Sequence, residues 1–202
     1  MRRNCLLILL LGCMAVVCSS CFSNKKLAAN YYYENEAALN DIEQSYRKLY
    51  KYKPFSVEFT DRDLDYVSIT FITEKLKYIY EFGFNEPRLA DSIRRFQMDT
   101  ATVLPLLRKM REIHCVWVNN LDYYVDGQKK NMTFLSMKPI LWKLPFTDKK
   151  YYILTFFNQP QYFDGEGRLL ANRKQRRLRR INDDVFKRIN DKVCYALSER
   201  FR

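Results

Sequence analysis

A cationic run near the C-terminal end is the feature of this 202-residue chain that is best suited to chemistry. Six of the eight residues from 173 to 180 are basic: Arg173, Lys174, Arg176, Arg177, Arg179 and Arg180. Like charges at this density repel one another unless they are solvated or paired with anions. We therefore regard the run as a candidate anion-binding segment, with a solvated surface that has no dedicated ligand as an alternative of equal weight.

A group of aspartates forms the second pattern. Asp61, Asp63 and Asp65 alternate with other residues as the ligands of a calcium loop do. The match is poor, because Tyr66 and Ile72 stand where such a loop has a glycine and a bidentate glutamate. A charged turn between two strands is the favoured interpretation.

No other grouping points to a reaction. His114 is the only histidine, and it forms no zinc set at a usual spacing with Cys115 and Cys194. A glycosidase would need two convergent carboxylates. The candidates for such a pair are Glu58, Glu81, Asp122, Asp164 and Glu166. The sequence thus predicts no cofactor, no metal site and no catalytic residue, and it leaves a hydrolase as an alternative.

Helices and antiparallel hairpins are the elements that position these residues. Apolar residues at helical spacing predict a helix from Asn35 to Lys51. Alternating apolar residues predict a three-stranded antiparallel meander from Pro54 to Phe82. Two helices follow, one starting at Pro87 and one from about Thr102 to Glu112, in which Pro105 is tolerated only in the first turn.

Strands dominate the next part of the chain. Ile113 to Val118 is apolar enough for a central strand, and Lys150 to Phe157 for another. One hairpin is expected between Tyr123–Val125 and Met132–Met137, with a long turn. Another is expected around the turn Asp164–Gly167.

A C-terminal helix is predicted from Asn182 to Ser198. Its apolar stripe consists of Val185, Ile189, Val193 and Ala196 with Leu197. Helices and hairpins segregate rather than alternate, which indicates the α+β class, with antiparallel hairpins and a meander packed with an N-terminal, two central and a C-terminal helix. We expect one domain over residues 31–202, and leave open a subdivision near residue 113.

Residues 1–20 have the layout of a secretory signal. Two arginines precede an apolar run from Cys5 to Val17, and two serines follow it before Cys21. The apolar run is shorter than the ~20 residues that a membrane-spanning helix needs. A permanent transmembrane anchor is therefore the less favoured alternative.

The segment Cys18–Cys21 resembles the lipobox of bacterial lipoproteins, and the likeness covers only the first 21 residues. It implies cleavage before Cys21 and a diacylglyceryl group on the Cys21 thiol, followed by a polar tether over residues 21–30. The match departs from the usual box, because Cys18 stands where Leu, Val or Ile is common. The segment Leu10–Cys13 fits the box better but leaves a very short apolar core, so Cys21 is favoured over Cys13. Cleavage without lipid is the third alternative.

Removal of this signal changes the composition of the remaining chain. Three of the six cysteines leave with it and Cys21 would carry lipid, so Cys115 and Cys194 would face an oxidising compartment. They are a disulfide candidate, and two buried free thiols are the alternative. The net charge falls from +12 to +10, because two arginines and no acid are lost, and 182 residues remain, enough for a domain with a sizeable core.

The predicted function combines the expected lipid anchor in the cell envelope with the cationic run. Nucleic acid is not the usual polyanion of a cell envelope, so no nucleic-acid partner is expected. We expect a lipid-anchored envelope lipoprotein with a binding or accessory role. Its basic face would meet anionic lipid, lipopolysaccharide, an acidic glycan or an envelope protein complex. Resemblance to lipoproteins favours the periplasmic face of the outer membrane, since no aspartate follows Cys21. The alternative is a glycan-active hydrolase or glycan-binding protein, which the abundant aromatic residues would suit, above all the triple tyrosine Tyr31–Tyr33 near the tether; ordinary packing of tyrosines in a sheet is the favoured interpretation of the others.

Overall fold

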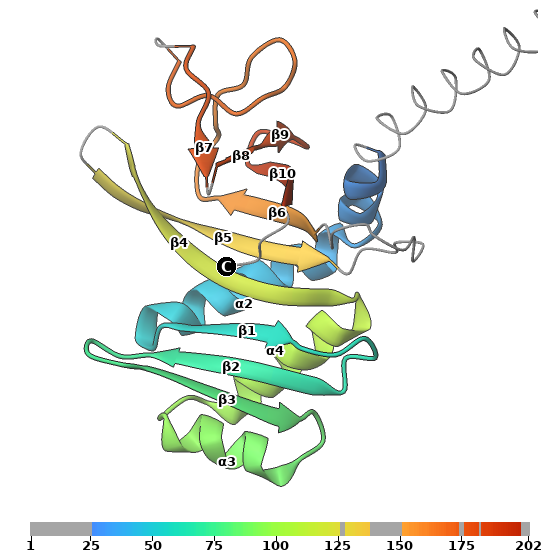
Figure 1. Cartoon of the computed structure of the whole chain (residues 1–202), viewed down its shortest axis with the longest axis vertical. Coiled ribbons are helices and arrows are strands. Elements are labelled where there is room, and N and C mark those ends of the chain that lie inside the picture. The colour runs from blue at the N-terminus through green and yellow to red at the C-terminus, as the bar shows by residue number, and fades with distance from the viewer. Residues whose placement is uncertain (1–25, 126–127, 138–150, 174–175, 182, 199–202) are drawn as a thin grey trace, which may run out of the picture. The chain divides into compact units, whose positions relative to one another are not determined.

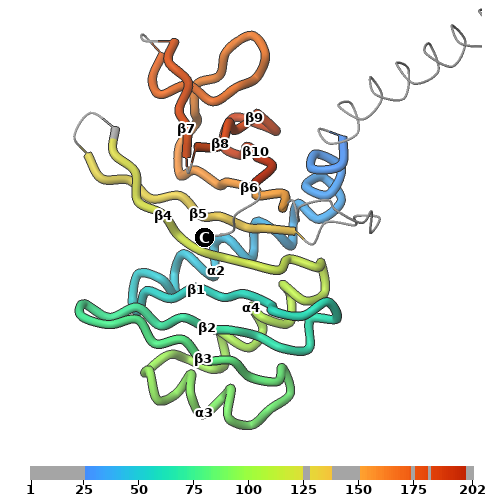
Figure 2. The backbone as a smooth tube through the Cα atoms, viewed as in Figure 1, coloured from blue at the N-terminus to red at the C-terminus, as the bar shows by residue number. Residues whose placement is uncertain are grey.

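The computed structural model describes residues 26–125, 128–137, 151–173, 176–181 and 183–198 (Figures 1 and 2). An eight-stranded antiparallel sheet and packed helices form the fold, which confirms the predicted α+β class. In chain order the elements are α2 (Glu36–Tyr52), β1 (Phe55–Phe59), β2 (Tyr66–Ile72), β3 (Lys77–Gly83), α3 (Pro87–Arg95), α4 (Thr100–Glu112), β4 (Cys115–Val125), β5 (Gln128–Met137), β6 (Tyr151–Phe157), β7 (Arg180–Ile181), β8 (Asp184–Val185), β9 (Lys187–Arg188) and β10 (Val193–Ser198).

The chain divides after residue 36 into two compact units. In the first unit, residues 26–34 are helical. The described part of the predicted tether, residues 26–30, is therefore helical rather than extended. The second unit is residues 37–202, with no division near residue 113.

The sheet has the strand order β3-β2-β1-β4-β5-β6-β10-β9. Its first three strands are the predicted meander, with β1 paired to β2 at Val57↔Ile69 and β2 paired to β3 at Ile69↔Tyr80. β4 joins β1 at Val57↔Val118. Val57, Ile69 and Val118 are fully buried, so the apolar residues of the alternating pattern face the core.

α2 and α4 lie on one face of this sheet, behind the strands in Figure 1. The Tyr46 hydroxyl of α2 donates a hydrogen bond to the Phe55 carbonyl of β1, and the two rings are 5.0 Å apart. Further along α2, the carboxylate of Glu43 accepts from the Thr133 hydroxyl of β5 at 3.4 Å. Because these contacts span strands from β1 to β5, α2 fixes the middle of the sheet.

The segment between β6 and β10 covers the other face, at the end of the sheet formed by β4, β5 and β6. The Phe186 ring lies 6.3 Å from Phe134 of β5, which in turn stacks with Trp117 of β4 at 6.1 Å. On β1, β2 and β3 the same face remains open: Tyr66 is 54% and Ile79 69% exposed. This face therefore has a covered half and an open half.

The predicted C-terminal helix is wrong. Residues 183–198 form β8, β9 and β10, and β10 pairs with β6 along its whole length. A turn at Asn190 separates β9 from β10, because its side-chain oxygen accepts from the N–H groups of Lys192 and Val193 at 2.9 and 2.8 Å. Ile189 and Val193 have helical spacing in the sequence but lie on the two sides of this turn.

The predicted central strands are confirmed as parts of β4 and β6, and the hairpin after β4 is longer than predicted. Residues 128–131 belong to β5 and pair with β4 as far as Val125↔Gln128, so they do not form the turn. The two helices after the meander are also confirmed. α3 begins at Pro87 as expected, whereas α4 begins at Thr100, which places Pro105 beyond the first turn.

No helix in the described part of the chain is long and apolar enough to cross a membrane. The proposed signal and Cys21 lie outside the described residues.

Candidate anion-binding cleft

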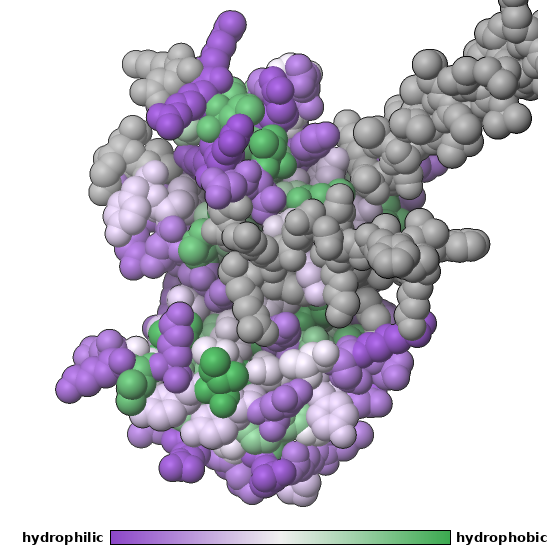
Figure 3. Space-filling view, viewed as in Figure 1, coloured by the Kyte–Doolittle hydropathy of each residue, from purple (hydrophilic) through white to green (hydrophobic). Residues whose placement is uncertain are grey.

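An open cleft of about 610 Å³ lies in the segment between β6 and β10. Two of the predicted cations, Arg173 and Arg176, line it together with Arg188 of β9 and the half-exposed Tyr162. Hydrophilic side chains gather over this end of the molecule in Figure 3. Guanidinium groups beside an aromatic ring can bind a phosphate or carboxylate and the sugar that carries it.

A tight turn at Asp164 forms one wall of the cleft. The Asp164 carboxylate accepts from the N–H groups of Glu166 and Arg168 at 3.0 and 2.7 Å, and Gly167 takes a φ of +76° that favours glycine. The Arg168 side chain donates back to Asp164 at 2.7 Å. This confirms the predicted turn, and it makes Asp164 a structural group of the wall.

The pKa of Asp164 is lowered by these contacts. Partial desolvation opposes the shift, but the hydrogen bonds from the Arg168 side chain and from the two backbone N–H groups outweigh it. Asp164 is therefore ionised and already bound to a cation at neutral pH. It does not compete strongly for the free arginines of the cleft.

Arg188 was missed by the sequence analysis because it fell inside the predicted C-terminal helix. Its guanidinium pairs with Asp191 at 2.5 Å and lies 5.6 Å from the centre of the Phe163 ring. These two contacts hold Arg188 at the cleft, and the Asp191 carboxylate compensates its charge. Asn190 and Asp191 are both residue types that favour turns, which could have indicated that the helix does not pass through this point.

Arg173 and Arg176 are the cleft cations whose charge is uncompensated. Both are exposed, and the described residues include no hydrogen-bonding or ion-pair partner for either side chain. The acids that line the cleft, Asp164 and Asp191, are engaged by Arg168 and Arg188. The positive charge at positions 173 and 176 is therefore available to a ligand.

Arg179, in contrast, is turned into the protein. It donates to the Gln161 side-chain oxygen at 3.0 Å and to the Ala171 carbonyl at 2.6 Å, and its guanidinium lies 5.2 Å from the centre of the Tyr123 ring. Desolvation lowers the pKa of Arg179, although the group remains charged at neutral pH. This member of the run ties the loop to β4 and is not part of the ligand surface.

The cationic run therefore does not form one face. Arg177 and Arg180 are exposed and do not line the cleft, and Lys174 lies outside the described residues. The structure brings two of the six predicted residues to the cleft and adds one cation from β9.

The predicted disulfide is wrong. Cys115 and Cys194 are buried free thiols on β4 and β10. Two strands, β5 and β6, separate them in the sheet, which corresponds to about 14 Å, whereas a disulfide needs Cα atoms within about 7 Å. Burial raises the pKa of the Cys115 thiol to about 12 and raises that of Cys194 as well, so both behave as small apolar residues.

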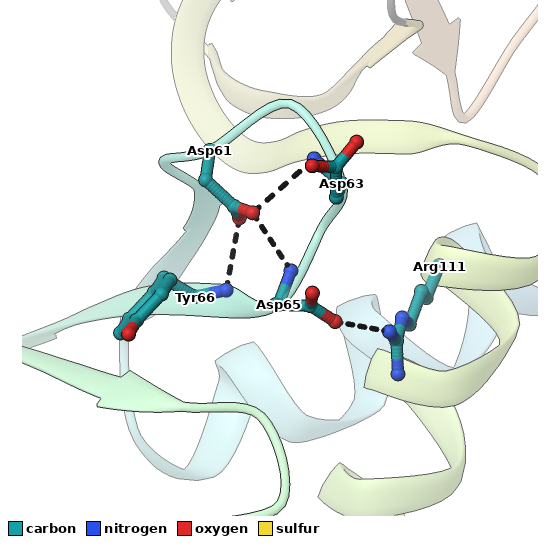
Figure 4. Close-up of polar contacts among 5 residues, drawn as sticks. All are labelled: Asp61, Asp63, Asp65, Tyr66 and Arg111. Carbon is teal, nitrogen blue, oxygen red and sulfur yellow. Dashed lines mark hydrogen bonds and ion pairs between the residues drawn. The ribbon is translucent and has the colours of Figure 1, made fainter.

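The aspartate pattern forms a charged turn, as favoured from the sequence. The Asp61 carboxylate accepts from the N–H groups of Asp63, Asp65 and Tyr66 at 3.2, 3.1 and 2.9 Å, and Asp65 pairs with Arg111 of α4 (Figure 4). Slight desolvation opposes the effect, but these N–H groups lower the pKa of Asp61. The carboxylates thus point to the backbone and to an arginine rather than to a shared cation site.

His114 lies at a second, shallower cleft of about 450 Å³, between Arg108 and Arg111 of α4 and the Asp63 turn. Within the described residues, no three histidine, cysteine or acidic side chains are grouped as metal ligands. The lone histidine therefore stands without a ligand set in this part of the chain.

The carboxylates proposed for a hydrolase have other partners, and two of them share one arginine. Arg168 binds both Asp164 and Glu166. Asp122 pairs with Lys129 at 2.8 Å on the β4–β5 hairpin. Glu81 accepts from the Thr60 hydroxyl, and Glu58 lies on β1. A general acid needs a raised pKa; among the described acids it is Glu43, not one of the five candidates, whose pKa is raised by burial.

A comparison with protein families, with curated proteins and with solved structures found no match for this chain.

Proposed function

We propose that this protein is a lipid-anchored lipoprotein of the cell envelope that binds an anionic glycan or lipid headgroup through the cleft of Arg173 and Arg176. The proposed anchor is the acylated Cys21, and the proposed location is the periplasmic face of the outer membrane. The role is binding or accessory, with no reaction assigned.

The observation that carries the proposal is the pair of uncompensated guanidinium groups. Arg173 and Arg176 line a concave site whose acids are already bound by other arginines. A guanidinium group presents several donors in one plane, which matches the oxygens of phosphate and carboxylate.

Tyr162 favours a sugar-bearing anion over an inorganic one. It is 50% exposed and lines the same cleft as the two arginines. Aromatic rings pack against the apolar faces of sugars, and the tyrosine hydroxyl stays hydrated at the rim. A concave site of this size suits one or two sugar residues better than it suits a flat membrane surface.

Binding of an acidic oligosaccharide to the full chain, measured by calorimetry at low and at physiological salt, tests the proposal. The double variant R173Q/R176Q should bind at least about tenfold more weakly, since each charge-assisted hydrogen bond is worth about 1.5–3 kcal/mol. The matched control R177Q/R180Q removes the same charge from the same run outside the cleft, and it should bind within about twofold of the parent. Equal losses in the two variants would show that only diffuse charge matters, and would refute the cleft as the site.

Two further experiments test which class of ligand binds and whether the chain carries the lipid anchor. Vesicles with and without anionic phospholipid, and purified lipopolysaccharide, show whether a lipid headgroup binds in place of a glycan. Intact mass of the membrane-bound product shows whether the chain begins at a lipid-modified Cys21. A soluble product cut elsewhere would refute the anchor while leaving the cleft to be judged by the binding data.

A further inference from the structure

The open edge of the sheet at β3 is independent of the cleft. β3 is the first strand in the sheet order and pairs on one side only, with β2. The hydrogen bonds of Thr73 to Leu76 and of Phe84 to Asp65 fix which backbone groups of β3 face β2. By the alternation of an antiparallel pair, Tyr78, Tyr80 and Phe82 bond to β2, and the groups of the intervening residues point outward.

Three consecutive outward positions are free. Glu86 caps Gly83, because its carboxylate accepts from the Gly83 N–H at 3.1 Å and its own N–H donates to the Gly83 carbonyl. The backbone groups of Lys77, Ile79 and Glu81 have no such partner among the described residues. Unpaired strand edges are templates for pairing with another strand.

The side chains at these positions are accessible. Lys77 and Glu81 are exposed, and Ile79 is 69% exposed. The end of α3 packs from the opposite face, where Phe96, the residue after the helix, stacks on Phe71 at a centroid distance of 4.0 Å. The edge therefore carries an exposed apolar residue between two charges of opposite sign.

We propose that β3 pairs with β3 of a second copy of this chain, antiparallel and centred on Ile79. In this register Lys77 lies opposite Glu81 of the second copy, Glu81 lies opposite Lys77, and the two Ile79 side chains meet. Because all three pairs are of the hydrogen-bonded type, six backbone hydrogen bonds form across the two-fold axis. A register centred on Lys77 or on Glu81 would instead set like charges opposite each other, which is destabilising.

The other edge of the sheet does not offer this arrangement. β9 has only the two residues Lys187 and Arg188, so pairing of β9 with β9 of a second copy would bring cations together. The Glu81 carboxylate accepts from the Thr60 hydroxyl at 2.5 Å, on the inner side of β3, so pairing with Lys77 of the second copy requires this side chain to turn toward the edge. Pairing along one short edge buries little area, so the dimer is weak.

A charge exchange tests the proposal. The full chain is examined by sedimentation equilibrium in a density-matched detergent, at low salt and up to about 1 mM protein. In K77E both charges of the edge are negative, and in E81K both are positive, so each variant alone should dimerise at least about tenfold more weakly than the parent. An equimolar mixture of K77E and E81K restores opposite charges at both positions and should dimerise as the parent does.

The control variant is K75E, which makes the same charge change in the exposed turn before β3 and should leave dimerisation unchanged. A parent chain that stays monomeric over this range overturns the proposal. So does a mixture that associates no better than its two components, or single variants that associate as the parent does.

Discussion

Replacement of Arg179 tests whether the cationic run has a structural part as well as a binding part. The side chain donates two hydrogen bonds, to Gln161 and to the Ala171 carbonyl, and stacks over Tyr123. Hydrogen bonds from a charged group contribute about 1.5–3 kcal/mol each, and a cation over a ring about 0.5–2 kcal/mol. Half-burying the guanidinium opposes these gains. We expect R179A to lower the free energy of unfolding by about 2–4 kcal/mol.

Two companion variants show what the loss measures. R177A removes an exposed cation from the same run and should change the free energy of unfolding by no more than about 0.5 kcal/mol. R179K keeps the charge but lacks the planar fork that reaches both acceptors, so it should recover less than half of the loss. Urea unfolding of the full chain, followed by far-UV circular dichroism, gives the free energy of unfolding of each variant. The comparison holds where the variants have the same dependence of this free energy on urea concentration. An R179A variant within about 0.5 kcal/mol of the parent would refute the assignment of Arg179 to the fold.

Two further predictions concern buried groups. Burial raises the pKa of Glu43, so the folded chain binds the proton of this carboxyl more tightly than the unfolded chain does. The protonated carboxyl therefore contributes to the free energy of unfolding below pH ~4.3, and this contribution is lost as pH rises through the raised pKa. Between about pH 4.5 and pH 7, the free energy of unfolding of E43Q should therefore rise relative to that of the parent. If the two free energies of unfolding change with pH in the same way over this range, the raised pKa of Glu43 is contradicted. Cys115 and Cys194 should resist alkylation in the native chain and react only in denaturant, because both thiols are buried and their pKa values are raised. Peptide mapping by mass spectrometry checks this, and a peptide linking the two cysteines would contradict the sheet order.

Local patterns were sufficient for the first half of the fold. The alternation at Val57 and Ile69 predicts the meander because one face of these strands is buried and the other is not, and Pro87 marks the start of α3 because its missing N–H costs nothing at that position. The extension of the β4–β5 hairpin was not predictable in the same way. Residues 128–131 are polar because they project beyond the part of the sheet that is covered, and only the pairing with β4 shows that they are strand.

The sequence predicted the kind of site, an anion-binding surface, but not which residues form it. A run of six cations predicts an anion-binding surface from charge density alone, yet it cannot show which side chains turn inward. Arg179 turns inward because Gln161 and Tyr123 meet it there, and those residues lie 18 and 56 positions away in the chain. Arg173 and Arg176 remain outside because the nearby acids are taken by Arg168 and Arg188.

The strands found where a helix is predicted for residues 182–198 decide two further assignments. As strand β10, Cys194 takes a fixed place between β6 and β9, which separates it from Cys115 by two strands and excludes the disulfide. As strand β9, Arg188 comes beside the Asp164 turn and completes the cleft. The apolar residues of this segment do have helical spacing, but the outer edge of β6 has backbone N–H and C=O groups that a strand can pair with and a helix cannot. Pairing along the whole of β10 therefore outweighed local periodicity, and it set both the state of the cysteines and the composition of the site.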